Sequence, residues 1–86
     1  MPRVAELKEE ILEFEGFEVD IHDMAGNKLR GNKFIDGDDY AIHTDDSVTV
    51  TTWENQFSRL YPGFFASPLK KDGSEANGHN QLGSIR

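Results

Sequence analysis

The sequence predicts a small α+β domain: an N-terminal helix, an antiparallel sheet of four to six hairpin-connected strands, and a short second helix packed on one face. Three observations support this. Apolar residues recur at helical spacing near the N-terminus, several short runs alternate between apolar and polar residues, and turn residues separate these runs. For 86 residues we expect a single domain with an ordered core over 1–69.

Residues 2–15 are expected to form the first helix. Pro2 stands at the first helical position, where its missing N–H costs nothing. An apolar stripe at helical spacing is formed by Val4, Leu7, Ile11, Leu12 and Phe14, and glutamates occupy most of the opposite face. Gly16 suits the left-handed conformation that commonly ends a helix.

Residues 14–31 are central to the prediction because residues 61–78 repeat their pattern of glycines and aromatic residues 47 positions later. The matched pairs are Phe14 and Tyr61, Gly16 and Gly63, Phe17 and Phe64, Gly26 and Gly73, and Gly31 and Gly78. We interpret both stretches as a helix stop, a strand, a glycine turn and a return strand. The alternative is two unrelated hairpins that obey the same turn chemistry. Pro68 makes the second copy an edge or irregular strand.

Further strands follow from alternation and β-branched residues. Residues 17–22 alternate apolar with polar side chains, and 28–35 form the return strand, bent at Gly31. Since Phe34 and Ile35 are adjacent, one of them is expected to leave the core face. Residues 40–43 and 48–51 predict the clearest hairpin of the chain, closed by a turn at 44–47.

A second helix is expected after a capping box in which Thr51 caps and Glu54 reaches back. Trp53, Phe57 and Tyr61 fall on one stripe, which we interpret as core and not as a ligand-stacking surface. Residues 70–86 predict a long turn and a last strand anchored by Leu82 and Ile85, or a frayed tail. The predicted core is Val4, Leu7, Ile11, Phe14, Phe17, Val19, Ile21, Leu29, Tyr40, Ile42, Val48, Val50, Trp53, Phe57, Leu60 and Phe64.

The net charge of −7 is unevenly distributed, with −8 on residues 1–46 and +1 on residues 47–86. Such a chain lacks the clustered Lys and Arg of proteins that bind nucleic acid directly. It has no cysteine for a disulfide or a thiolate zinc site. It also has neither an apolar run of about 20 residues nor a signal-peptide core. We therefore expect a soluble cytoplasmic protein without a membrane partner.

No motif predicts catalysis, a metal or a cofactor. The chain has no GxSxG, P-loop, GxGxxG or HExxH pattern, and a domain of this size seldom encloses a ligand pocket. His22 and His43 are interpreted as surface histidines, and the aspartates near them as turn residues. The loop 36–39 is too short for a calcium-binding EF-hand.

The acidic half of the chain predicts a non-enzymatic interaction module for a protein partner with a basic surface. The expected contact residues are Glu6, Glu9, Glu10, Glu13, Asp36, Asp38, Asp39, Asp45 and Asp46. One alternative is an inhibitor that mimics nucleic acid toward a DNA- or RNA-binding protein. Others are a structural homo-oligomer subunit that pairs strand edges, and a divalent-cation binder.

Overall fold

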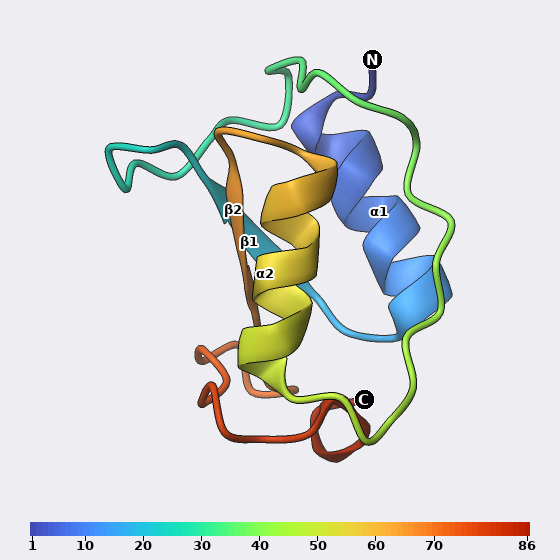
Figure 1. The fold of residues 1–86 in the computed structure, drawn as a ribbon. Coiled ribbons are helices and arrows are strands. Elements are labelled where there is room, and N and C mark those ends of the chain that lie inside the picture. The colour runs from blue at the N-terminus through green and yellow to red at the C-terminus, as the bar shows by residue number, and fades with distance from the viewer.

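The computed structural model describes residues 1–86 and has two helices and two strands in alternation (Figure 1). The order is α1 (Val4–Glu15), β1 (Val19–His22), α2 (Val50–Leu60) and β2 (Phe65–Pro68), followed by a short 3-10 helix, η1 (Leu82–Ser84). The α+β class is confirmed. The predicted four to six strands are wrong, because β1 and β2 alone form the antiparallel sheet.

Helix α1 forms where the apolar stripe predicted it. Val4, Leu7 and Ile11 are buried, while the glutamates on the opposite face remain largely exposed. Leu12 and Phe14, predicted on the same stripe, lie outside it and are exposed. Gly16 follows with a φ of 84°, and its N–H donates to the Leu12 carbonyl, which ends the helix. The stripe continues by one further position to Glu15, which is also buried.

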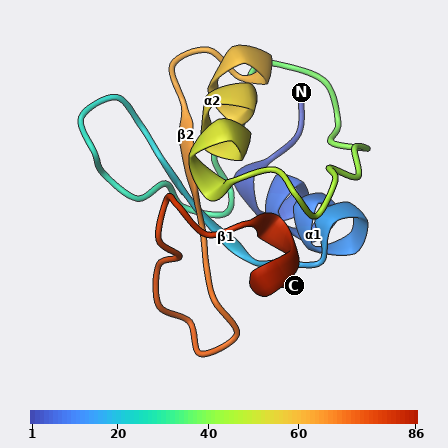
Figure 2. The ribbon, with the colours of Figure 1, turned by 60° about the horizontal axis from the view of Figure 1, so that its bottom comes forward.

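The sheet buries only one of its faces. Val19 pairs with Pro68 and Ile21 pairs with Ala66, and all four side chains are buried. Asp20 and His22 point to the other face and are partly exposed. Both helices therefore lie against the same face, and they run in opposite directions (Figures 1 and 2).

The two glycine-punctuated stretches share one arrangement, although the return strand that the repeat predicted for each is reduced to isolated bridges. Residues 2–35 and 48–82 each form a helix, a strand, a turn and a segment that returns to the start of the helix. The Val4 N–H donates to the Lys33 carbonyl, and the Val50 N–H donates in the same way to Asn80, both at 2.8 Å.

The turns and the sheet register of the two copies also match. Gly26 and Gly73 adopt φ values of 82° and 88° in equivalent turns. Asp20 and Ser67 are equivalent at a separation of 47 residues, and they are paired with each other in the sheet. An approximate two-fold axis thus passes through this pair and relates the two copies.

Several predicted strands are absent, and the reason lies in side-chain burial. Residues 40–43 and 48–51 form no hairpin: 40–43 are irregular, and α2 begins at Val50 with Thr49, not Thr51, as its cap. Val50 belongs to the buried stripe with Trp53 and Phe57, so tertiary packing overrides its strand propensity. The return strand 28–35 is reduced to single bridges at Lys28 and Phe34.

The core differs from the predicted one at its edges. Phe14, Ile42 and Leu60 were expected inside but are 40, 43 and 46% exposed. Phe34 faces solvent while Ile35 is buried, so one of the two does leave the core. Residues 70–81 form largely exposed turns and the predicted last strand is absent, while Leu82 and Ile85, which the predicted core omitted, are buried.

Candidate functional site

Residues 36–48, here called the strap, carry five of the nine predicted contact residues. The strap has no helix or strand, and it runs along α1 before entering α2 (Figure 1). Side chains hold it in place: the Tyr40 N–H donates to the Glu10 carboxylate at 3.2 Å, and the Tyr61 hydroxyl donates to the Asp38 carbonyl at 2.8 Å.

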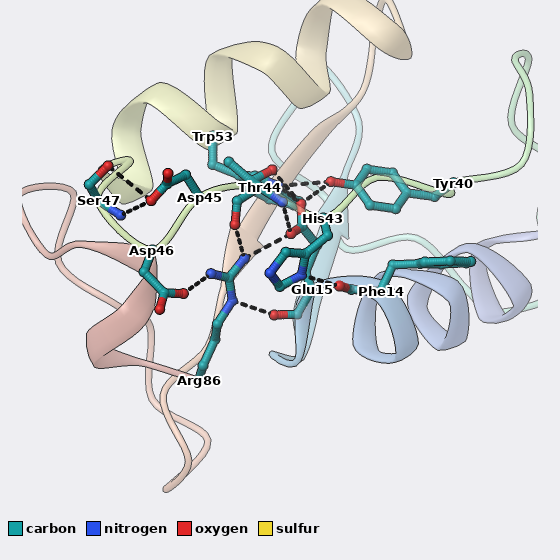
Figure 3. Close-up of polar contacts among 10 residues, drawn as sticks. All are labelled: Phe14, Glu15, Tyr40, His43, Thr44, Asp45, Asp46, Ser47, Trp53 and Arg86. Carbon is teal, nitrogen blue, oxygen red and sulfur yellow. Dashed lines mark hydrogen bonds and ion pairs between the residues drawn. The ribbon is translucent and has the colours of Figure 1, made fainter.

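The strongest anchor of the strap is the carboxylate of Glu15, which is 1% exposed (Figure 3). Its Oε1 accepts from the Thr44 N–H at 2.6 Å and from the Arg86 guanidinium at 2.9 Å. Its Oε2 accepts from the Thr44 hydroxyl at 2.6 Å, from the Trp53 indole N–H at 2.9 Å, and from the Tyr40 hydroxyl. We call these five residues the Glu15 network.

All three guanidinium nitrogens of Arg86 donate hydrogen bonds (Figure 3). Besides the Glu15 carboxylate, it donates to the Glu15 carbonyl from Nε at 2.5 Å and to the Thr44 carbonyl from Nη2 at 2.6 Å. Its Nη1 pairs with the Asp46 carboxylate, and the guanidinium lies 5.9 Å from the centre of the Phe17 ring. The planar fork of arginine suits such a set of acceptors better than a lysine would.

The Glu15 network keeps its carboxylate charged. Burial raises the pKa of Glu15, but the hydrogen bonds from Thr44, Tyr40 and Trp53 together outweigh it, and the pKa lies below the usual 4.5. Burial and the neighbouring carboxylate raise the pKa of Tyr40, so its hydroxyl stays a donor. No buried side-chain nitrogen or oxygen in the protein lacks a hydrogen-bond partner.

The network joins α1, the strap, α2 and Arg86, and so it fixes a groove between the strap and α2. The groove consists of two adjoining hollows of about 260 and 250 Å³, which share Tyr40, Ile42 and Leu60. The first hollow also reaches Trp53 and Phe57, and the second is flanked by Asp38 and Asp39.

The nine predicted carboxylates are all at least partly exposed, but they do not form a single cluster. Glu10, Asp38 and Asp39 gather around Tyr61: burial and then these three charges raise the pKa of its hydroxyl to about 12. Glu6 and Glu13 lie on the exposed face of α1, and Asp36 begins the strap.

The remaining carboxylates are set apart. Asp45 accepts hydrogen bonds from Ser47, which lower its pKa, and Asp46 pairs with Arg86. Glu9 lies on the other flank of α1, beside Lys8 and Glu18. Among the nine, only Asp46 forms an ion pair within the chain.

The sequence analysis missed the Glu15 network. The spacing of Val4, Leu7 and Ile11 continues to Glu15 and could have marked it as buried, but its charge argued against burial. Nothing in the local sequence links it to Thr44 or Arg86. His43 lies on the strap with its Nδ1 2.8 Å from the Phe14 carbonyl, and no group of three or more acidic or histidine side chains is placed to hold a metal ion.

Comparison with known protein families, curated proteins and solved structures finds no match to this chain. Neither helix has the length and apolar character that a membrane span requires. The functional argument therefore rests on the geometry of the strap, the groove and the exposed carboxylates.

Proposed function

We propose that the protein is a small, non-catalytic interaction module that binds a basic surface of a partner protein. The observation that supports this proposal is that most of the predicted contact carboxylates form no ion pair with a basic side chain of the same molecule. The carboxylates of α1 and the strap that were predicted as contacts, Asp46 excepted, have no Lys, Arg or His within ion-pair distance. Such charges are free to attract a basic partner and to accelerate association at low salt.

Two alternatives receive less support. The inhibitor that mimics nucleic acid is a special case of this proposal, in which the basic surface belongs to a nucleic-acid-binding protein. A homo-oligomer built by strand addition would need open sheet edges. Here the return segments cover part of both edges, since Leu29 donates to the Ile21 carbonyl and Ala76 donates to the Pro68 carbonyl, both at 2.9 Å.

The proposal is tested by selection from a random peptide library displayed on phage, a method that works before any partner has been identified. Peptides retained by the protein should be enriched in Lys and Arg over the unselected library. Their binding should weaken as salt rises, because screening shortens the range of the attraction. Retained peptides without this enrichment would contradict the proposal.

A pair of variants with equal net charge locates the interaction. D38N/D39N removes two strap charges, while E18Q/E75Q removes two exposed charges from other parts of the molecule. D38N/D39N should weaken binding of a selected peptide about three- to tenfold, as expected for two exposed charge contacts. E18Q/E75Q should change it by less than about twofold, and equal losses from both would show that net charge alone governs binding.

A further inference from the structure

We infer that the groove between the strap and α2 holds two apolar side chains of the partner's basic segment. This inference rests on the proposed function and specifies which partner segments fit. The groove is floored by aromatic side chains, with Tyr40 shared by both hollows and Trp53 and Phe57 in the first. Its walls are Ile42 on the strap and Leu60 on α2, which leave 43% and 46% of their surface in water.

The two hollows have room for apolar side chains. Their volumes are about 260 and 250 Å³, and because the hollows adjoin, the whole groove falls within the range of roughly 300–1,000 Å³ that ligand pockets occupy. Each hollow is far larger than the share of about 30 Å³ that one water molecule takes in the liquid. A single aliphatic or aromatic side chain can enter each hollow and exchange this water for apolar contact.

The length of the groove sets the spacing of the two side chains. On α2 and its cap, the lining residues extend from Trp53 to Tyr61, eight residue steps, which correspond to about 12 Å at ~1.5 Å per residue. Side chains three or four positions apart on a helix are separated by about 5–6 Å, so two of them fit along this length. Peptides anchored in helical grooves commonly use this spacing.

The charges beside the two hollows determine in which direction the partner segment lies in the groove. Asp38 and Asp39 flank the second hollow, whereas Arg59 lines the first, and none of the three forms an ion pair in the chain. A Lys or Arg next to the anchor in the second hollow would meet both aspartates. The same residue at the first hollow would face Arg59, so the basic end of the segment belongs at the second hollow.

The peptide selection described above separates this inference from the proposed function. If both hold, the enriched peptides carry two apolar residues three or four positions apart in addition to Lys and Arg. Basic peptides without such a pair would overturn the inference and leave the proposed function standing. Selected peptides with neither feature would overturn both.

Variants of the groove wall give the second test, with one selected peptide as the probe in a fluorescence anisotropy titration. I42S and L60S should each weaken binding about five- to tenfold, the range typical of truncated anchor contacts. L12S is the matched control, because Leu12 is a helical leucine of α1 that is 45% exposed, close to the value for Leu60. If L60S and L12S have equal effects, the groove is not the site.

A variant that should strengthen peptide binding provides a third test. R59Q removes the positive charge beside the first hollow and should strengthen peptide binding about two- to threefold, as expected for one exposed charge contact. Circular dichroism confirms that each variant is folded. If the unliganded protein instead sediments as a dimer that I42S dissociates, a second copy occupies the groove and the inference is wrong.

Discussion

At the level of single residues, Glu15 carries a charge that its burial alone would penalise. Its carboxylate is buried at the C-terminal end of α1, where the helix dipole is also negative. Such a charge is tolerated only when charged and polar donors surround it, and the Arg86, Thr44, Trp53 and Tyr40 donors meet this condition.

We predict that E15Q lowers the free energy of unfolding by about 3–5 kcal/mol, the cost of breaking a buried ion pair. The new amide would present N–H groups to surrounding donors and leave Arg86 without its counter-charge. Against a total stability of about 4–13 kcal/mol for a chain of this length, the loss is large.

Urea unfolding followed by Trp53 fluorescence measures this difference. E13Q, an exposed change in the same helix, is the control and should stay within about 0.5 kcal/mol of the parent protein. R86K provides a milder variant, since lysine keeps the charge but cannot satisfy every acceptor that the guanidinium reaches. Unfolding energies of E15Q and E13Q that agree would contradict the assigned role.

Acid should unfold the protein partly through the same carboxylate. Because folding lowers the pKa of Glu15 below 4.5, its contribution to stability is fully present above pH 4.5. It is lost as the pH falls from that value through the lower pKa of the folded state. Urea titrations from about pH 6 to about pH 3 should therefore show a steeper loss for the parent protein than for T44V, which removes the hydroxyl that contributes most to lowering this pKa. Parallel curves would indicate that Glu15 titrates normally.

At the level of elements, the strap depends on its first turn as well as on the Glu15 network. Gly37 has a φ of 135°, and a Cβ atom there would lie 2.8 Å from the Tyr61 ring. The contact between Gly37 and the Tyr61 ring brings the strap against the end of α2, where the Tyr61 hydroxyl donates to the Asp38 carbonyl.

G37A should therefore destabilise the protein through both backbone strain and collision. Gly63 separates the two causes: its φ is 89°, but a Cβ there would meet nothing within 4 Å. We expect about 1 kcal/mol of loss for G63A from strain alone and about 2–3 kcal/mol for G37A. Thermal unfolding of the two variants measures both values, and equal losses would show that Tyr61 readily moves aside.

Elements differ in how far the sequence reveals them. α1 could be predicted from the spacing of Val4, Leu7 and Ile11, because burial and local propensity agree there. The start of α2 could not, since the run 48–51 has strand propensity and only its packing beside Trp53 makes it helical. The carboxylates were recognisable as exposed, whereas the groove was not, because its walls come from positions far apart in the chain.

At the level of the whole molecule, the internal repeat could be predicted from glycine punctuation, but its symmetry could not. The pairing of Asp20 with Ser67 depends on contact between the two copies, which no local pattern encodes. The connection between the copies breaks the symmetry, because the strap follows the first copy and carries the groove wall and five of the nine predicted contact carboxylates. One wall of the proposed groove therefore lies in the part of the molecule that is not repeated, and the other wall lies on α2 of the second copy.

Most backbone hydrogen bonds of each copy lie within that copy, since its return segment accepts hydrogen bonds from the first turn of its own helix. Two separate polypeptides, cut between the copies at the exposed Gly37, would each retain these local bonds. They would meet again through the β1 and β2 ribbon and the shared apolar face. We expect fragments 1–37 and 38–86 to reassociate as a 1:1 complex, detectable by gel filtration, so that a continuous chain is dispensable for the fold.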